Sequence, residues 1–237
     1  MRRVYFDIET YRPRQEFMFI NEKIIAIGLL IEGRSMEQEI ILKIWEFESE
    51  EALVRTFYNI AKLYIFGYTE LIGFNIMRFD IPLLKQKALQ YNIKQLPELN
   101  VLWDTPFVFD LFQASLPLNS IKFKGNTLEN LRSIFVEAGF DIPSIYGRGS
   151  DVATLYESGR YGEILMHLER DLIVMREIYK VWRSQSFLYR ILLSIGSRKD
   201  LEDVKKIFMD IVRSGKCHES ILGGAKKCVV AKARLMG

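Results

Sequence analysis

Cysteine and histidine are both scarce in this chain of 237 residues, with two of each. Cys217 and Cys228 are too few for a disulfide framework, and with His218 they match no familiar zinc-binding spacing, so we expect ordinary thiols in a reducing compartment. Long apolar runs are also missing. The longest covers residues 24–31, whereas about 20 residues are needed to span a bilayer. The N-terminus shows no signal-peptide pattern, and we therefore expect an intracellular, cytoplasmic protein.

A strong excess of either charge is likewise absent. The chain has 33 Lys and Arg against 30 Asp and Glu, a net charge of +3 that does not by itself indicate a nucleic-acid binder. The basic surplus lies after residue 195, where ten basic residues stand against five acidic ones and the last cations are Lys226, Lys227, Lys232 and Arg234. This basic tail would suit phosphate contacts, but a solvated terminal segment explains it equally well.

Apolar residues are abundant, at 49%, and the chain can therefore bury a sizeable core. Short or alternating apolar runs predict strands, and apolar residues three and four positions apart predict helices. The order of these segments predicts an α/β domain whose mixed sheet has an antiparallel N-terminal part and helices on both faces. The expected strands are 4–10, 23–32, 38–45, 71–75 and 107–111. The expected helices are 50–65, 81–91, one beginning at 127, 162–182 and an amphipathic 198–214.

Two carboxylates lie two positions apart in the first expected strand, within Phe6-Asp7-Ile8-Glu9-Thr10. Side chains alternate between the two faces of a strand, so Asp7 and Glu9 share one face. Two anions held so close repel each other, which points to a bound cation or to a division of acid and base roles. An edge strand with a solvated face is the plain alternative.

Two further motifs place acidic residues at the start of a helix and along a helix. The segment from Gly73 to Asp80 runs from a strand end into a helix start, where open α/β sheets bind their ligands. Asp80 could instead act only as a helix cap. Further along, His167 and Asp171 lie one helical turn apart on the same side of a helix, a pair that can also be a simple surface contact.

Taken together, these motifs resemble the DEDD superfamily of 3′-to-5′ exonucleases, and most closely the proofreading domain of family B DNA polymerases. The segments 6–10, 73–80 and 167–171 look like the three motifs of that family in the same order, and the resemblance covers about residues 1–185. It implies a ribonuclease H-like fold, with a mixed five-stranded sheet flanked by helices. It also implies that the metal ligands are Asp7, Glu9, Asp80 and Asp171.

Other positions match the family as well. By the same resemblance, Thr10, Asn75 and Phe79 line the path of the 3′-terminal nucleotide. Asp110 lies in a further family-like segment, and we assign it a structural role. The implied cofactors are two Mg²⁺ or Mn²⁺ ions about 4 Å apart, which activate a water and stabilise the leaving oxygen. Such hard cations prefer carboxylate ligands.

His167 is the expected general base, because histidine changes charge near neutral pH. Its spacing departs from the family's pattern. One subgroup has Tyr four residues before the last Asp and the other has His five before it, whereas this chain has His at four and Met166 at five. The residue type thus matches one subgroup and the spacing the other. Tyr161 is a more distant alternative.

We therefore expect an exonuclease domain over residues 1–195, followed by a helical extension and basic tail over 196–237. With no polymerase domain in the sequence, we expect a stand-alone enzyme or a detached subunit, acting without a membrane and with replication or repair proteins as partners. The expected activity is metal-dependent hydrolysis at single-stranded 3′ ends, with DNA favoured over RNA. An RNA-directed nuclease of the same fold and a non-catalytic nucleic-acid-binding module remain open alternatives.

Overall fold

The computed structural model describes residues 2–12, 22–33, 36–119 and 121–183. The chain divides into two compact units, of which the first comprises Met1–Arg132 and Ile142–Tyr179 and the second Ser133–Asp141 and Lys180–Gly237. All candidate site residues belong to the first unit. The predicted helix 198–214, the basic tail, both cysteines and the expected boundary after residue 195 lie outside the described residues.

The first unit is built on a mixed five-stranded sheet in the order β3-β2-β1-β4-β5. β1 pairs with β2 and β2 with β3 in antiparallel fashion, whereas β1 with β4 and β4 with β5 are parallel. The predicted fold class is confirmed, and β1 is the central strand. The strands are β1 (Arg2–Tyr11), β2 (Lys23–Glu32), β3 (Glu37–Lys43), β4 (Thr69–Gly73) and β5 (Phe107–Asp110).

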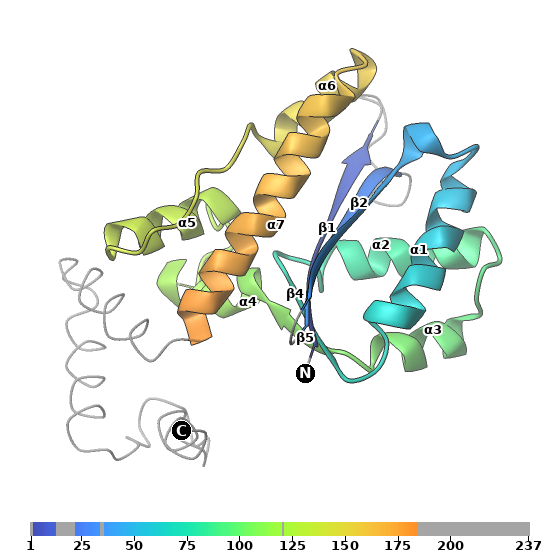
Figure 1. The fold of residues 1–237 in the computed structure, drawn as a ribbon, viewed down its shortest axis with the longest axis horizontal. Coiled ribbons are helices and arrows are strands. Elements are labelled where there is room, and N and C mark those ends of the chain that lie inside the picture. The colour runs from blue at the N-terminus through green and yellow to red at the C-terminus, as the bar shows by residue number, and fades with distance from the viewer. Residues whose placement is uncertain (1, 13–21, 34–35, 120, 184–237) are drawn as a thin grey trace. The chain divides into compact units, whose positions relative to one another are not determined.

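Helices cover both faces of this sheet, with α1 and α2 on one face and α7 on the other (Figure 1). The predicted segments at 50–65, 81–91 and 162–182 are helical, and Thr127 accepts a hydrogen bond from the Asn130 amide at the start of the expected helix. The helices are α1 (Glu50–Tyr64), α2 (Asp80–Gln90), α3 (Leu96–Trp103), α4 (Leu111–Ser115), α5 (Leu128–Glu137), α6 (Val152–Glu157) and α7 (Tyr161–Arg183).

Some predicted boundaries are wrong. The third strand ends at Lys43, and Trp45 lies in a short 3₁₀ turn, Ile44–Glu46, where its ring stacks on Tyr161 at 4.4 Å between centroids. β4 ends at Gly73, so that Asn75 falls in the loop after the strand. Helices α3, α4 and α6 were not predicted, because elements of five to eight residues are too short to show a helical period.

The two faces of β1 have different partners. Val4, Phe6 and Ile8 belong to the buried apolar core, where the Phe6 ring lies 5.9 Å from that of Phe57 in α1. On the opposite face, Tyr5 contacts Tyr179 of α7 edge to face, with 6.2 Å between ring centroids. Because side chains alternate along a strand, Asp7 and Glu9 project to the same side as Tyr5, toward α7.

Helix α7 approaches the sheet closely at a glycine. Gly28 of β2 pairs with Asp7 of β1, and an added methyl group there would lie 2.8 Å from Leu172 and 3.0 Å from Leu168. Carbon atoms do not pack at such distances, so a larger residue would require the two leucine side chains to shift. The helix that carries His167 and Asp171 is thereby held next to the strand that carries Asp7 and Glu9.

Candidate active site

Asp7 and Glu9 lie on the central strand of the sheet rather than on a solvated edge strand. β1 has neighbours on both sides, and Glu9 is only 7% exposed, while Asp7 keeps part of its surface accessible. The edge-strand alternative is therefore wrong. A register shift between Glu9 and Thr10 interrupts the ladder with β2 directly after the second acid. Such bulges re-aim side chains and often occur beside functional sites.

Asp80 is the first residue of α2, which follows β4, the strand next to β1. The loop after β4 leads into α2, whose N-cap residue, Phe79, makes no capping hydrogen bond through its side chain. The Asp80 carboxyl is 3% exposed, and its Oδ1 atom is buried without a hydrogen-bond partner. The backbone N–H groups that contact this carboxyl belong to Asp80 itself and to Ile8 of β1, and neither is the bond to the following turn of α2 that a helix cap makes.

His167 and Asp171 come from α7. His167 is 6% exposed, and the surface-contact alternative for this pair is therefore wrong. The Nε2 atom of His167 lies 3.7 Å from Glu9 Oε1 and 3.9 Å from Asp171 Oδ2. On the other side of the ring, Nδ1 is hydrogen-bonded to the backbone carbonyl of Tyr146. Since a carbonyl only accepts, Nδ1 carries a proton, and Nε2 is left to face the carboxylates.

The four acids perturb one another electrostatically. Burial, together with the charge of Asp171, raises the pKa of Asp7 from 3.8 to about 8, although His167 opposes this shift. Burial raises the pKa of Asp171 to about 7. The pKa of Glu9 is raised by burial and by the other three acids, and that of Asp80 by burial and by Asp7. Residues far apart in the sequence are thus brought into one cluster that resists full ionisation.

This cluster has the chemistry that a hard divalent cation requires. Carboxylate oxygens are the preferred ligands of Mg²⁺ and Mn²⁺, and the Oδ1 atoms of both Asp80 and Asp171 are buried with no hydrogen-bond partner. A cation would satisfy those oxygens and remove the mutual repulsion. In the part of the chain that the structure describes, however, no three Asp, Glu, His or Cys side chains already surround a single metal position. The donor set therefore fits the ions, while its present arrangement is not that of a closed metal centre.

Asp110 holds the loop between β4 and α2. Its carboxylate accepts backbone N–H bonds from Asn75 at 2.8 Å, from Met77 at 3.0 Å and from Phe112 at 2.9 Å. The bonds from Asn75 and Met77 hold the loop around Asn75, whose φ of 65° is unusual for a residue other than glycine. The carboxylate thus accepts hydrogen bonds from backbone N–H groups, in agreement with the structural role we assigned to Asp110. The Asn75 Oδ1 atom has no hydrogen-bond partner.

The other two predicted substrate residues have protein partners of their own. Thr10 donates a hydrogen bond of 2.6 Å to Glu22, a buried acid that also pairs with Arg12. Phe79 is partly buried and packs against the apolar core. Sequence reasoning missed Glu22, because it lies in a polar connection with no periodic pattern, and a single acid there gives no signal.

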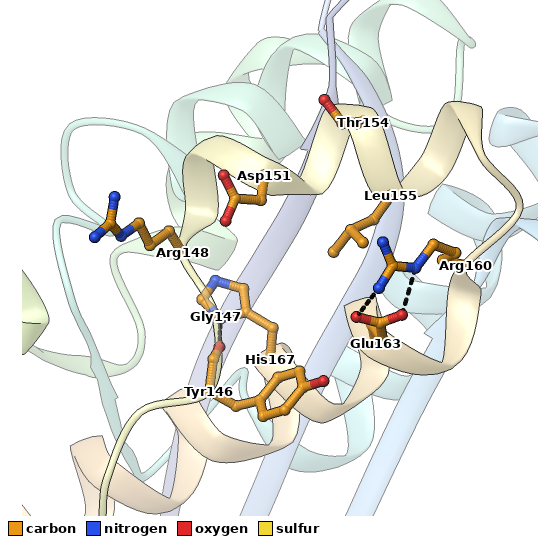
Figure 2. A pocket seen from close by; sticks show the side chains of 9 residues that line it. All are labelled: Tyr146, Gly147, Arg148, Asp151, Thr154, Leu155, Arg160, Glu163 and His167. Carbon is orange, nitrogen blue, oxygen red and sulfur yellow. Dashed lines mark hydrogen bonds and ion pairs between the residues drawn. The ribbon is translucent and has the colours of Figure 1, made fainter.

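A pocket of about 330 Å³ opens beside His167 (Figure 2). Its wall includes Tyr146, whose carbonyl holds the histidine ring. Arg160 and Glu163 form a two-point ion pair on another side of the pocket. The volume lies at the lower end of the range of small-molecule sites. The lining residues are Tyr146, Gly147, Arg148, Asp151, Thr154, Leu155, Arg160, Glu163 and His167.

Met166 and Tyr161 are the two other positions that bear on which residue is the general base. Met166, which occupies the five-residue spacing before Asp171, is 42% exposed and adjoins the buried His167 on the helix. Tyr161, the alternative base, is packed between Trp45 and Tyr156, with ring centroids at 4.4 and 5.7 Å. His167 has a titratable atom, Nε2, within 4 Å of two carboxylates of the cluster.

The mixed five-stranded sheet and the helices that flank it agree with the α/β fold of exonuclease domains. Residues 1–115 match the family model described as DNA polymerase family B, exonuclease domain. The resemblance inferred from the sequence motifs is thus confirmed, and the match includes Asp7, Glu9 and Asp80. The third motif, with His167 and Asp171, lies beyond the matched residues.

One solved structure agrees at the level of the fold. The family B DNA polymerase of the archaeon Pyrobaculum calidifontis aligns with a TM-score of 0.54 and 16% identity, covering 86% of this chain and 27% of the polymerase. A zinc-bound complex of E. coli exonuclease I with single-stranded DNA aligns with a TM-score of 0.47 and 13% identity, over 81% of this chain and 43% of that one. This chain therefore spans less than half of either protein.

A search of curated proteins finds no match. None of the helices that the structure describes combines the length and the apolar character needed to cross a bilayer.

Proposed function

We propose that this protein is a metal-dependent 3′-to-5′ exonuclease that hydrolyses phosphodiester bonds at single-stranded 3′ ends. The observation that carries the proposal is the buried cluster of Asp7, Glu9, Asp80 and Asp171, in which two oxygens have no partner and the acids raise one another's pKa. Such a cluster is costly without a cation, and a fold has no structural need for it. The match to an exonuclease domain of DNA polymerases favours DNA over RNA.

The four carboxylates would hold two Mg²⁺ or Mn²⁺ ions. When bound, these ions supply the charge that activates water and stabilises the leaving 3′ oxygen. Ions of this kind are also the expected counter-charge for phosphate groups entering a site lined by acids, because the acids alone would repel the substrate.

His167 would take the proton from the attacking water. Its Nδ1–H is committed to the Tyr146 carbonyl, so the ring is held in one orientation and Nε2 faces Glu9 and Asp171. A base whose ring is already oriented loses little freedom when the reaction begins. Asn75, with a rigid backbone and an unpartnered side-chain oxygen, would contact the terminal nucleotide beside Phe79 and Thr10.

Two alternatives are distinguished by one experiment. An RNA-directed nuclease of the same fold would differ in contacts to the 2′-hydroxyl, and a non-catalytic module would bind strands without cutting them. We would incubate the protein with 5′-labelled single-stranded DNA and RNA, with Mg²⁺, with Mn²⁺ and with EDTA. The proposal expects a ladder of shortening labelled products from DNA, formed only with metal.

The same assay is run with the site variant Asp7→Ala and with its matched control, Asp104→Ala. Asp104 is an exposed acid at the end of α3, and its removal changes the net charge by the same amount as loss of a site aspartate. A ladder from RNA alone would transfer the proposal to the RNA-directed alternative. Binding without products under every metal condition would favour the non-catalytic module.

A further inference from the structure

An exposed group of aromatic and basic side chains lies beside the loop that leads to Asp80. Phe123 is 53% exposed, and the guanidinium of Arg78 lies 4.9 Å from the centre of its ring. Met77 and Ile121 are also well exposed. The stacking surface, as we call this group, consists of Met77, Arg78, Ile121, Lys122, Phe123 and Lys124.

The stacking surface is anchored in the core through an aromatic chain. The Phe123 ring lies 5.7 Å from the buried Phe112, which lies 5.5 Å from Phe74 at the start of the site loop. Arg78 also lies over Phe112, at 5.6 Å from the ring centre. Phe123 is therefore held in place by packing on one side, while more than half of its surface stays open to solvent.

Hydrogen bonds also hold the backbone of the Phe123 loop. The side-chain amide of Asn119 donates to the carbonyls of Lys122 and Lys124, and that of Asn130 donates to the carbonyl of Gly125. These bonds fix the turn on both sides of Phe123. A rigid, exposed ring loses little conformational entropy when a flat ligand stacks on it, which is the requirement for a binding platform.

The charge of the surface has one sign. Arg78, Lys122 and Lys124 are exposed, and none of them forms an ion pair with any residue that the structure describes. Three exposed cations around an apolar ring are the combination that single-stranded nucleic acids require, because bases stack on the ring while the cations meet phosphates. An acidic peptide would use the cations but has no need of an open aromatic face.

We propose that the stacking surface binds an unpaired base of the strand whose 3′ end lies at the carboxylate cluster, with Phe123 stacking on the base and Arg78, Lys122 and Lys124 contacting phosphates. The inference rests on the proposed exonuclease function. The link between the two sites is Asp110, which binds the amides of both Asn75 and Met77. The segment between β4 and α2 thus places Asn75 and Asp80 at the carboxylate cluster and Met77 and Arg78 at the stacking surface, where the nucleic-acid strand would bind.

The test compares the equilibrium binding of a fluorescein-labelled dT12 oligonucleotide by the full chain in EDTA, where no cleavage occurs. Phe123→Ala should weaken binding about tenfold, and Phe123→Trp should restore it, because stacking depends on an aromatic face. Phe107→Ala is the matched control: Phe107 is 62% exposed, but it lies at the opposite end of β5 from Asp110. Its dT12 affinity should stay within about twofold of wild type.

Lysine variants test the phosphate contacts separately. Lys122→Gln with Lys124→Gln should flatten the plot of log Kd against log salt, by about 0.7 for each lost contact. In Mn²⁺, Phe123→Ala should also lower the ratio of kcat/KM for dT12 to kcat/KM for a chromogenic thymidine 5′-phosphate ester, which has no neighbouring base. Equal dT12 affinities for Phe123→Ala and Phe107→Ala would overturn the inference. If the wild type binds dT12 but cleaves neither substrate, the proposed exonuclease function is wrong. The dT12 affinities of Phe123→Ala and Phe107→Ala then still decide whether the stacking surface binds a base.

Discussion

The Nε2 atom of His167 lies 3.7 Å from Oε1 of Glu9, although the two residues are 158 positions apart in the sequence. The ring is oriented by the Tyr146 carbonyl on its other side. A histidine whose one nitrogen is held by the backbone and whose other nitrogen faces an acidic cluster has the geometry of a base that acts on a water bound there.

His167→Ala should therefore lower the rate constant of single-turnover cleavage about 10²-fold with little change in substrate affinity, because the interaction forms mainly as the proton moves. Added imidazole should recover part of the rate, and His167→Tyr should be less damaging than the alanine variant, since a hydroxyl can still orient water. Tyr161→Phe serves as the control. A His167→Ala enzyme with the wild-type rate would place the base elsewhere.

Removal of a single acid should abolish turnover without unfolding the protein. Asp7→Ala and Asp80→Ala each delete a proposed metal ligand, and each also relieves repulsion in the cluster. We expect less than about a tenth of wild-type turnover at saturating Mn²⁺, with an unchanged circular dichroism spectrum. Asp104→Ala should retain full activity. Substantial turnover by either site variant would remove that residue from the ligand set.

The stability of the metal-free protein should fall as the pH rises. The pKa of Asp7 is about 8 in the folded protein against an ordinary 3.8, so the folded state binds protons more tightly than the unfolded state. The stabilising effect of this carboxyl is complete below about pH 4 and is lost as the pH rises toward 8, at about 1 kcal/mol per pH unit. Asp171, with a pKa of about 7, acts in the same direction.

Thermal unfolding in EDTA at pH 6 and pH 8 measures this effect. Asp7→Asn should reduce the difference between the two midpoints, because its side chain does not titrate. Excess Mn²⁺ should raise the wild-type midpoint more at pH 8 than at pH 6, where protons compete for the same oxygens. The same pH dependence in Asp7→Asn as in wild type would show that this carboxyl is not the source.

Asp110→Ala should destabilise the protein by about 3 kcal/mol, since it leaves three backbone N–H groups without their acceptor. Cleavage should fall as well, because Asn75 and the start of α2 lose their anchor. Asp110→Asn should be milder, as its one oxygen can still accept. Urea denaturation checks the first claim. A variant as stable as wild type but inactive would instead mark Asp110 as a direct participant.

The sequence predicted those parts of the site whose signal is local. Alternation along a strand places Asp7 and Glu9 on one face, and a four-residue spacing on a helix places His167 beside Asp171. The resemblance of the motif order added Asp80. The partners that hold these residues were not predictable. His167 is held by the backbone carbonyl of Tyr146, and because every residue has such a carbonyl, the sequence does not mark this one. Likewise, the pairing of Thr10 with Glu22 depends on how the connection before β2 returns to the end of β1, which no spacing in the sequence reveals.

A methyl group added at Gly28, on the strand next to β1, would press on the helix that carries His167 and Asp171. Leu168 and Leu172 rest on Gly28, so a larger residue there requires these two side chains to shift, and α7 with them where they cannot. Alanine and valine at this position would act as spacers of increasing thickness beneath the helix. The spacing of the four acids is thus sensitive to a residue that has no charge and leaves every acid in place.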